Sequence, residues 1–401
     1  MSRSIKEVAF ETIGASADAH LQKSRRFNRY LADHMGSRDN RIDQLRLGAA
    51  LAVVLGHSWF ITLGRHAQVP LENLTLFGFH SLAVHVFFFL SGLLVTESAQ
   101  RHATKPMRYV AKRAMRIMPA LIVNALLVPV VLIATGAWTG VGFGDMARYT
   151  FRLVTLFSVE FEHPHAFANS PFAGAINGSV WSLRHEIIVY ALLIFASMSG
   201  ALARPGRRIA FLAVLFAYVA FGHLVAPHAH SGALFLFAEG RYVMWSFLLG
   251  VAAHQFAKYV PLHPVIALPG VALLIVGEVC GVRLIAENAI IYLVCAGTLL
   301  IAYPRGKSFK LPYDVSYGVY IYSWPVQQLA VFFAAKMFGI ALSPLGLFFI
   351  CLGPLLVIAL GSWLWVERPA LSLLNARQQK RAPARDKAPA TVGNILLQES
   401  K

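Results

Sequence analysis

The chain has 401 residues, of which 57% are hydrophobic and 14% are charged. An average soluble protein carries about 25% charged residues, so this composition excludes an ordinary soluble fold. The net charge of +17 would suggest a nucleic-acid partner in a soluble chain. In a hydrophobic chain, the distribution of this charge between the two sides of a membrane must be considered first. We expect no nucleic-acid partner.

The apolar residues are gathered into runs of about 17 to 25 residues, the length that spans hydrocarbon as a helix. Ten such runs occur, at 45–64, 78–97, 117–137, 180–199, 209–226, 233–253, 264–280, 287–303, 314–338 and 343–366. Helices satisfy their own backbone hydrogen bonds in lipid, whereas open sheet edges do not. The sequence therefore predicts an all-α, polytopic integral membrane protein with about ten transmembrane helices, in contact with membrane lipids.

The distribution of Lys and Arg among the loops predicts the orientation of the chain in the membrane. With the N-terminus inside, 28 of them fall on the cytoplasmic side and 4 outside, which is a strong positive-inside signal. Both termini are then cytoplasmic. We divide the chain into a basic cytoplasmic arm at 1–44, a transmembrane domain at 45–369 and a basic, disordered tail at 370–401. The transmembrane domain includes a long outer loop at 138–179, which we expect to cover an outward-facing cavity.

The first apolar run carries Arg46 and His57, eleven residues apart. Eleven helical residues make about three turns, so the two side chains share one face about 16 Å apart along the axis. Arg46 lies at the cytoplasmic edge, and His57 lies about seven residues below the outer edge. We expect a neutral imidazole at that depth, the state that a general base requires. The alternative is a hydrogen-bonded structural histidine.

Glu186 is the second candidate inside the membrane, because counting from the outer edge places it at the depth of His57. An intramembrane carboxylate needs a partner. It either accepts the Nδ1 proton of His57, holding the tautomer that leaves Nε2 free, or binds acceptor hydroxyls. The competing interpretation is a structural ion pair with the neighbouring Arg184 and His185.

Weaker signals come from histidines and aromatic residues in the loops and at span ends. His163 and His165 form a His-x-His pair, but no third ligand is near in sequence, so we predict no metal site. Trp181 and Tyr320 are candidates for stacking against a sugar. The alternative for both is an interface anchor, which is the common role of aromatic residues at span ends.

The first span resembles that of membrane acyltransferase family 3, with Arg46, ten residues and then His57, and Asp43 three residues before the arginine. Five later segments are similar to the family in the expected order, from about residue 43 to 369: AVHVFFFLSGLLVT, KRAMRIMPA, NGSVWSLRHEIIVY, YDVSYGVYIYSWPVQQ and WVERP. The chain departs from many members at Ser323, where they carry histidine.

The resemblance implies a bacterial O-acyltransferase that uses cytoplasmic acyl-CoA, most simply acetyl-CoA, as a co-substrate and binds no cofactor permanently. It implies a carbohydrate acceptor such as an exopolysaccharide, O-antigen or lipid-linked glycan. Arg46, Arg113 and Arg116 would hold the phosphates of the donor, Asp43, Trp181 and Tyr320 would bind substrate, and His57 with Glu186 would be catalytic. Ordinary positive-inside anchoring is the alternative for Arg113 and Arg116.

We therefore predict an acyltransferase in the bacterial inner membrane, with polysaccharide-assembly proteins as possible partners. His57 would remove the acceptor proton for direct transfer, and an acyl-histidine intermediate stays open. A glycan transporter or flippase that uses His57 and Glu186 as a proton relay is the main alternative. The second alternative is a non-catalytic assembly partner of an envelope polysaccharide machine. The sequence does not identify the acceptor, the acyl chain, the pathway or the oligomeric state.

Overall fold

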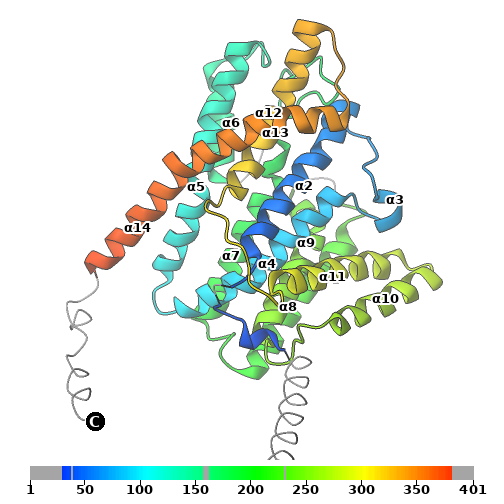
Figure 1. Ribbon diagram of the computed structural model, residues 1–401, viewed down its shortest axis with the longest axis vertical. Helices are drawn as coiled ribbons and strands as arrows, with labels where there is room; N and C mark the ends of the chain where they lie inside the picture. Colours follow the sequence, from blue (N-terminus) through cyan, green and yellow to red (C-terminus); the bar gives the residue numbers. More distant parts are fainter. Residues whose placement is uncertain (1–28, 38, 157–161, 230–231, 382–401) are drawn as a thin grey trace, which may run out of the picture.

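The computed structural model describes residues 29–37, 39–156, 162–229 and 232–381, and the structure of this part is helical with three isolated β-bridges (Figure 1). The first half comprises η1 (Leu31–Asp33), α2 (Ile42–Leu63), α3 (Glu72–Thr75), α4 (Phe79–Arg101), α5 (Pro106–Thr135), α6 (Phe143–Thr155), η2 (Gly178–Val180) and α7 (Trp181–Met198). The second half comprises α8 (Pro205–Val225), α9 (Gly232–Gln255), η3 (Pro264–Ala267), α10 (Leu268–Val279), α11 (Arg283–Ala302), α12 (Ser316–Phe338), α13 (Pro344–Ser362), a π-helical turn η4 (Trp363–Glu367) and α14 (Arg368–Arg381).

Eight helices of the described chain are long and apolar enough to cross a membrane, which makes this a multi-pass, all-α membrane protein. All ten predicted apolar runs lie on helices, but two of them miss these criteria. The run at 264–280 is shortened because it begins as the 3₁₀ turn η3 before the 12-residue α10. The run at 314–338 forms the 23-residue α12, whose amide and hydroxyl side chains lower its hydropathy. The count of ten spans therefore stays a prediction.

The centre of the bundle is made by α2, α4, α9 and α12. Gly92 of α4 and Gly250 of α9 lie where these two helices cross, and a Cβ on either would overlap the backbone of the other. Small residues at a crossing allow close van der Waals packing, which is a main source of helix association in lipid. α12 packs between α2, α5 and α13, and more than half of its residues are buried. The serine and glutamine side chains of α12 therefore face protein and not lipid.

A proline inside α12 creates a polar contact with the loop before α7. Pro325 has no N–H, so the carbonyl of Ile321 loses its helical partner. That carbonyl accepts hydrogen bonds from Asn124 of α5 at 3.2 Å and from Asn177 at 2.9 Å. Asn177 also donates to the Oδ1 of Asn124 at 3.1 Å. The freed carbonyl is satisfied in this way, and the end of the 138–179 loop is fixed against α12.

The described parts of the 138–179 loop contain a helix and contact the end of α2. They contain α6 and two β-bridges, Trp138 with Ala166 and Glu162 with Ala175. Arg65, which follows α2, pairs with Glu162 at 2.6 Å and donates to the carbonyl of Ala173 at 3.1 Å. The loop is therefore held over the end of α2 that carries His57, as a cover for the cavity described below.

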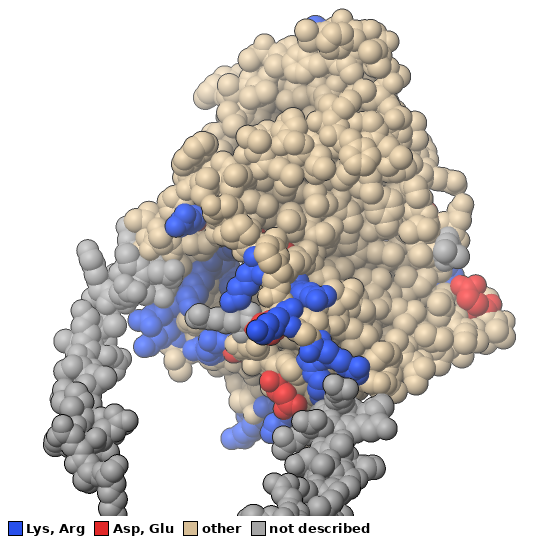
Figure 2. Space-filling model, in the orientation of Figure 1, with Lys and Arg blue, Asp and Glu red and all other residues tan. Residues whose placement is uncertain are grey.

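Most of the Lys and Arg side chains visible in Figure 2 lie on the lower half of the molecule in this view. This is the end at which the described chain begins. This distribution agrees with the charge pattern of the sequence. Which side of the membrane it faces stays a prediction. Most of the predicted basic arm, residues 1–28 and 38, and the tail from 382 onward lie outside the described residues.

The predicted disordered tail differs from the structure over its first part. Residues 368–381 form α14, which continues α13 through the π-helical turn (orange to red in Figure 1). α14 packs against α5 and η4, and Leu371 and Leu374 line a cavity. Partial burial of these leucines explains why the helix extends beyond the predicted boundary at 369.

Candidate active site

A cavity of about 400 Å³ lies between α2, α4, α5, α7, α12 and α14, and we call it the arginine cavity. Its charged lining residues are Arg46, Lys112, Arg113, Arg116, Glu186 and Asp314. The structure thus brings together all three arginines that were predicted to bind the donor. With both carboxylates ionised, the lining has a net positive charge of about two, which favours an anionic ligand.

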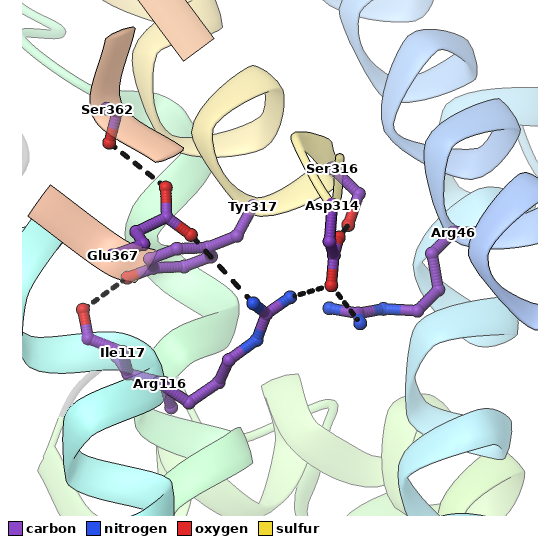
Figure 3. A network of polar contacts seen from close by, with 8 residues as sticks. All are labelled: Arg46, Arg116, Ile117, Asp314, Ser316, Tyr317, Ser362 and Glu367. Atoms are coloured by element: carbon purple, nitrogen blue, oxygen red, sulfur yellow. Dashed lines mark hydrogen bonds and ion pairs between the residues drawn. The ribbon is translucent and has the colours of Figure 1, made fainter. Parts of the chain in front are cut away.

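Asp314 binds two of these arginines at once (Figure 3). Its Oδ2 accepts from Arg46 Nη1 at 3.0 Å and from Arg116 Nη2 at 2.6 Å, and its Oδ1 accepts from Ser316 Oγ at 2.7 Å. Asp314 precedes α12 and lies outside the eight spanning helices. Burial alone would raise the pKa of Asp314, but the charges of Arg46 and Arg116 with these hydrogen bonds outweigh burial and lower it to about 2. A single ionised carboxylate therefore joins α2, α5 and the start of α12.

A second carboxylate approaches Arg116 from the π-helical turn η4. Glu367 is buried, and its Oε2 lies 3.9 Å from Arg116 Nη1. Its Oε1 accepts from Ser362 Oγ at 3.0 Å (Figure 3). The guanidinium of Arg116 also lies 6.0 Å from the ring centre of Trp363. Arg116 is thus fixed from both sides by protein groups.

Arg113 differs from the other two arginines because no carboxylate within the described residues pairs with it. Its guanidinium lies over the ring of Tyr190, 5.6 Å from the centre, and its Nε is buried with no hydrogen-bond partner. An unsatisfied buried donor costs about 1–3 kcal/mol, more if charged. Arg113 is therefore the cation of the cavity best prepared to receive an external anion.

Glu186 lies in the arginine cavity and accepts a hydrogen bond from Tyr190 of its own helix. The predicted bond from His57 is absent, because His57 Nδ1 has no partner within the described residues. The competing prediction of an ion pair with Arg184 is also wrong, since Arg184 pairs with Glu239 of α9. Equal depth in two helices does not fix their rotation, which here turns Glu186 toward the arginines.

His57 lines a second cavity of about 360 Å³, which we call the histidine cavity. The other lining residues are mostly aromatic or small: Val53, Phe60, Arg65, His80, Ser81, Val84, Phe172, Gly178, Trp181, Tyr320 and Trp324. The ring of Trp324 meets that of His57 edge to face with centres 4.8 Å apart. Phe172 and Gly178 belong to the 138–179 loop, so this loop forms part of the cavity wall. That the cavity faces outward stays a prediction.

The two cavities share a wall. Val84 of α4 and Tyr320 of α12 line both of them. The hydroxyl groups of Tyr320 and Ser182 are 2.7 Å apart, which holds the tyrosine ring in place. The predicted substrate residues Trp181 and Tyr320 therefore both lie beside His57. Asp43 is exposed in the first turn of α2 and lines neither cavity.

Two of the remaining polar candidates have structural contacts. Ser323 is buried, donates to the carbonyl of Tyr320 at 3.0 Å and lines neither cavity. His163 Nδ1 accepts from the indole N–H of Trp138 at 3.0 Å. Within the described ranges, no three His, Cys, Asp or Glu residues lie together in a way that would hold a metal ion.

Sequence reasoning missed the roles of Asp314, Glu367 and His80. Asp314 lies in YDVSYG and Glu367 in WVERP, two segments whose similarity was noticed without a role for the acid. The available signal was an isolated carboxylate beside the basic stretch 304–313, since such a group usually has a cationic partner. No sequence signal pairs His80 with His57.

A family model described as an acyltransferase domain, that of the acyltransferase 3 family, matches residues 39–364. The chain belongs to membrane acyltransferase family 3. It is 27% identical over 380 residues to nodulation protein 10 of Rhizobium leguminosarum bv. viciae, covering 87% of this chain and 98% of that protein. It is 27% identical over 308 residues to an O-acetyl transferase of Shigella phage Sf6, covering 73% and 86% of the two chains. No solved structure matches.

Membership in acyltransferase family 3 makes this protein a membrane O-acyltransferase. A transferase of this kind must hold an acyl donor and a hydroxyl acceptor with their reacting atoms in contact.

Proposed function

We propose that this protein transfers an acyl group, in the simplest case acetyl, from acyl-CoA to a hydroxyl of a carbohydrate acceptor. One observation carries the proposal: a basic cavity and an aromatic cavity containing a buried histidine share the wall formed by Val84 and Tyr320. A nucleotide head in the first cavity would place its thioester toward the second. The acceptor hydroxyl would meet it beside His57.

The donor is supported by the charge of the arginine cavity and by the spacing of Arg46 and His57 along α2. Arg113 lacks a carboxylate partner, and Arg46 and Arg116 are held in fixed positions by Asp314. Guanidinium groups suit phosphate oxygens because they donate in a planar fork. The rise of about 16 Å between Arg46 and His57 along α2 is of the order of a pantetheine arm.

The acceptor is supported by the lining of the histidine cavity. Phe172, Trp181, Tyr320 and Trp324 offer rings and edges against which a sugar can pack, and no carboxylate among the described residues lines this cavity. Ligand sites of this kind combine apolar walls with a few polar groups that fix orientation. The cover formed by the 138–179 loop is where we place acceptor preference.

The mechanism follows from the position of His57. The imidazole takes the proton of the acceptor hydroxyl, the oxygen attacks the thioester carbonyl, and the carbon–sulfur bond breaks. The thiolate leaves toward the arginine cavity and receives the proton from His57. In the alternative route the imidazole itself is acylated first, and a burst of thiol release without acceptor would identify that route.

We place the protein in the bacterial inner membrane, with the arginine cavity opening toward the cytoplasm, where acyl-CoA is found. The positive-inside pattern of the sequence and the basic end of the molecule in Figure 2 support this orientation. Polysaccharide-assembly proteins are proposed partners, because the product would enter an envelope glycan.

The test is free-thiol release from external acetyl-CoA by sealed inverted membrane vesicles, prepared with and without an envelope glycan fraction in the lumen. We expect the glycan to stimulate release by wild type and the substitution His57→Gln to lower it by about 10²- to 10⁴-fold, the usual contribution of a general base. His66→Gln, an exposed histidine that lines neither cavity, serves as the control. Glycan movement without thiol release would instead identify a transporter.

A further inference from the structure

The histidine cavity contains a second imidazole, that of His80, whose ring centre lies 6.4 Å from that of His57. Space for this ring is made by two glycines. A Cβ at Gly56 of α2 or at Gly78 before α4 would overlap the His80 side chain. The ring also meets Phe60 edge to face at 5.0 Å. The position of His80 is therefore fixed by the surrounding helices.

The two imidazoles share an unusual hydrogen-bonding state. Nδ1 of His57 and Nδ1 of His80 are both enclosed and have no partner among the residues that the structure describes. This leaves Nε2 of each ring as the nitrogen that can reach the cavity lined by both rings.

The separation of the rings fits one oxygen atom held between them. A hydroxyl oxygen about 2.8 Å from one nitrogen of each ring would lie about 4 Å from each ring centre. With the centres 6.4 Å apart, the angle at that oxygen is about 107°, close to tetrahedral. An alcohol oxygen has this geometry, with one O–H donor and two lone pairs as acceptors.

We propose that the acceptor hydroxyl binds between His57 and His80, donating to Nε2 of His57 and accepting from the Nε2–H of His80. This assignment rests on the proposed function and adds His80 to it as a catalytic residue. This arrangement fixes the directions of the carbon substituent, the proton and one lone pair of the acceptor oxygen. The remaining lone pair is the one that attacks the thioester.

The transfer step is balanced in this arrangement. The acceptor O–H bond breaks, its proton passes to His57, the new carbon–oxygen bond forms, and the carbon–sulfur bond breaks. The thiolate then takes the proton from His57. His80 keeps its proton throughout and orients the hydroxyl, an effect that depends on placing the reacting atoms to within about 1 Å.

Labelled-acetyl transfer to the envelope glycan fraction, measured in vesicles with His80→Phe, His80→Gln and His80→Asn, tests the proposal. Glutamine extends its amide N–H toward the position of Nε2, whereas asparagine ends near Nδ1 and phenylalanine donates no hydrogen bond. We expect His80→Phe and His80→Asn to lower kcat/KM for the acceptor by about 10- to 100-fold. His80→Gln should recover most of this loss, and the KM for acetyl-CoA should stay within about twofold of wild type in all three.

Three results separate the possible failures. Wild-type acceptor kinetics in His80→Phe would overturn the inference while leaving the proposed function intact. Equal losses in His80→Gln and His80→Phe, together with a changed KM for acetyl-CoA, would show that His80 is only structural. Absence of acetyl transfer by wild-type protein would overturn the proposed function itself. Size-exclusion chromatography of each variant in detergent, with His66→Gln as the control, confirms that the compared proteins are folded.

Discussion

Individual residues in the arginine cavity differ in their electrostatic state, although all three arginines were predicted to act alike. Arg46 and Arg116 share the carboxylate of Asp314, whereas Arg113 has only the ring of Tyr190 within the described chain. A bound anion therefore competes with Asp314 for two of the arginines and meets no competitor at the third. This difference predicts unequal effects of substitution.

We expect Arg113→Gln to raise the KM for acetyl-CoA by about 10-fold or more with a small change in kcat, because a hydrogen bond to a charged group is worth about 1.5–3 kcal/mol. Arg108→Gln is the matched control, since Arg108 is an exposed residue of the same helix that lines neither cavity. The measurement is initial-rate kinetics of thiol release. An unchanged KM in Arg113→Gln would remove this residue from the donor site.

Asp314→Asn should destabilise the protein, because it leaves Arg46 and Arg116 close together without their shared carboxylate. The side chains are 17–26% exposed, so we discount the loss for solvent screening and expect about 2 kcal/mol. Thermal unfolding in detergent should show a lower Tm for the variant at pH 7. An unchanged Tm would mean that the ion pairs contribute no net stability.

The same variant makes a pH-dependent prediction. The pKa of Asp314 is lowered from 3.8 to about 2 in the folded protein, so its contribution is fully present above about pH 4 and is lost as the pH falls toward 2. The Tm difference between wild type and Asp314→Asn should therefore be constant from pH 8 to 5 and shrink below pH 4. A difference that disappears already between pH 7 and 5 would contradict the assigned pKa.

For individual residues, the sequence was a better guide to which residues line a cavity than to which residues contact each other. Helical periodicity placed Arg46 and His57 on one face of α2, and each lines one of two adjoining cavities. Depth along α7 was not enough to pair Glu186 with His57, because the rotation of one helix against another depends on packing. Asp314 comes from a connection whose path the sequence pattern does not specify.

Among the elements, α12 connects the two cavities and the cover. Its proline frees the carbonyl of Ile321, which Asn124 and Asn177 satisfy. We expect Asn177→Ala to lower stability by about 1–3 kcal/mol, the cost of leaving a buried group unsatisfied. Thermal unfolding of the detergent-solubilised protein measures this loss.

Pro325→Ala supplies the control, since it returns an N–H to the carbonyl of Ile321. In a double-mutant cycle, Asn177→Ala should cost less in the Pro325→Ala background than in wild type. Additive effects of the two substitutions would show that the asparagine does not act through this carbonyl. Ser179→Ala, a neighbouring substitution that leaves the asparagine contacts in place, tests whether the loop is merely sensitive to change.

Prediction at the scale of elements succeeded where an apolar run was long enough to span a membrane, and it failed at the ends of such runs. All ten runs lie on helices, because burial in lipid or protein requires internally satisfied backbone. α14 was missed because its charged composition suggested disorder, while Leu371 and Leu374 pack against the arginine cavity. Such tertiary stabilisation is not visible in composition.

The molecule as a whole is proposed to bring a cytoplasmic donor to an acceptor from the other side. We therefore expect Lys112→Cys, in the arginine cavity, and Arg65→Cys, in the histidine cavity, to react with a membrane-impermeant maleimide from opposite sides. Both are tested in a Cys280→Ser background, because Cys280 is exposed and Cys295 and Cys351 are buried. Labelling of both positions from one side would contradict the proposed path.

The most direct test of the central claim uses sealed inverted vesicles containing a glycan fraction in the lumen and radiolabelled acetyl-CoA outside. We predict that label enters the enclosed glycan with wild-type protein, and that His57→Gln lowers the rate by at least about 100-fold. His66→Gln should match wild type. Label that reaches the glycan equally well with His57→Gln, or glycan that crosses the membrane without ever being labelled, would contradict the account.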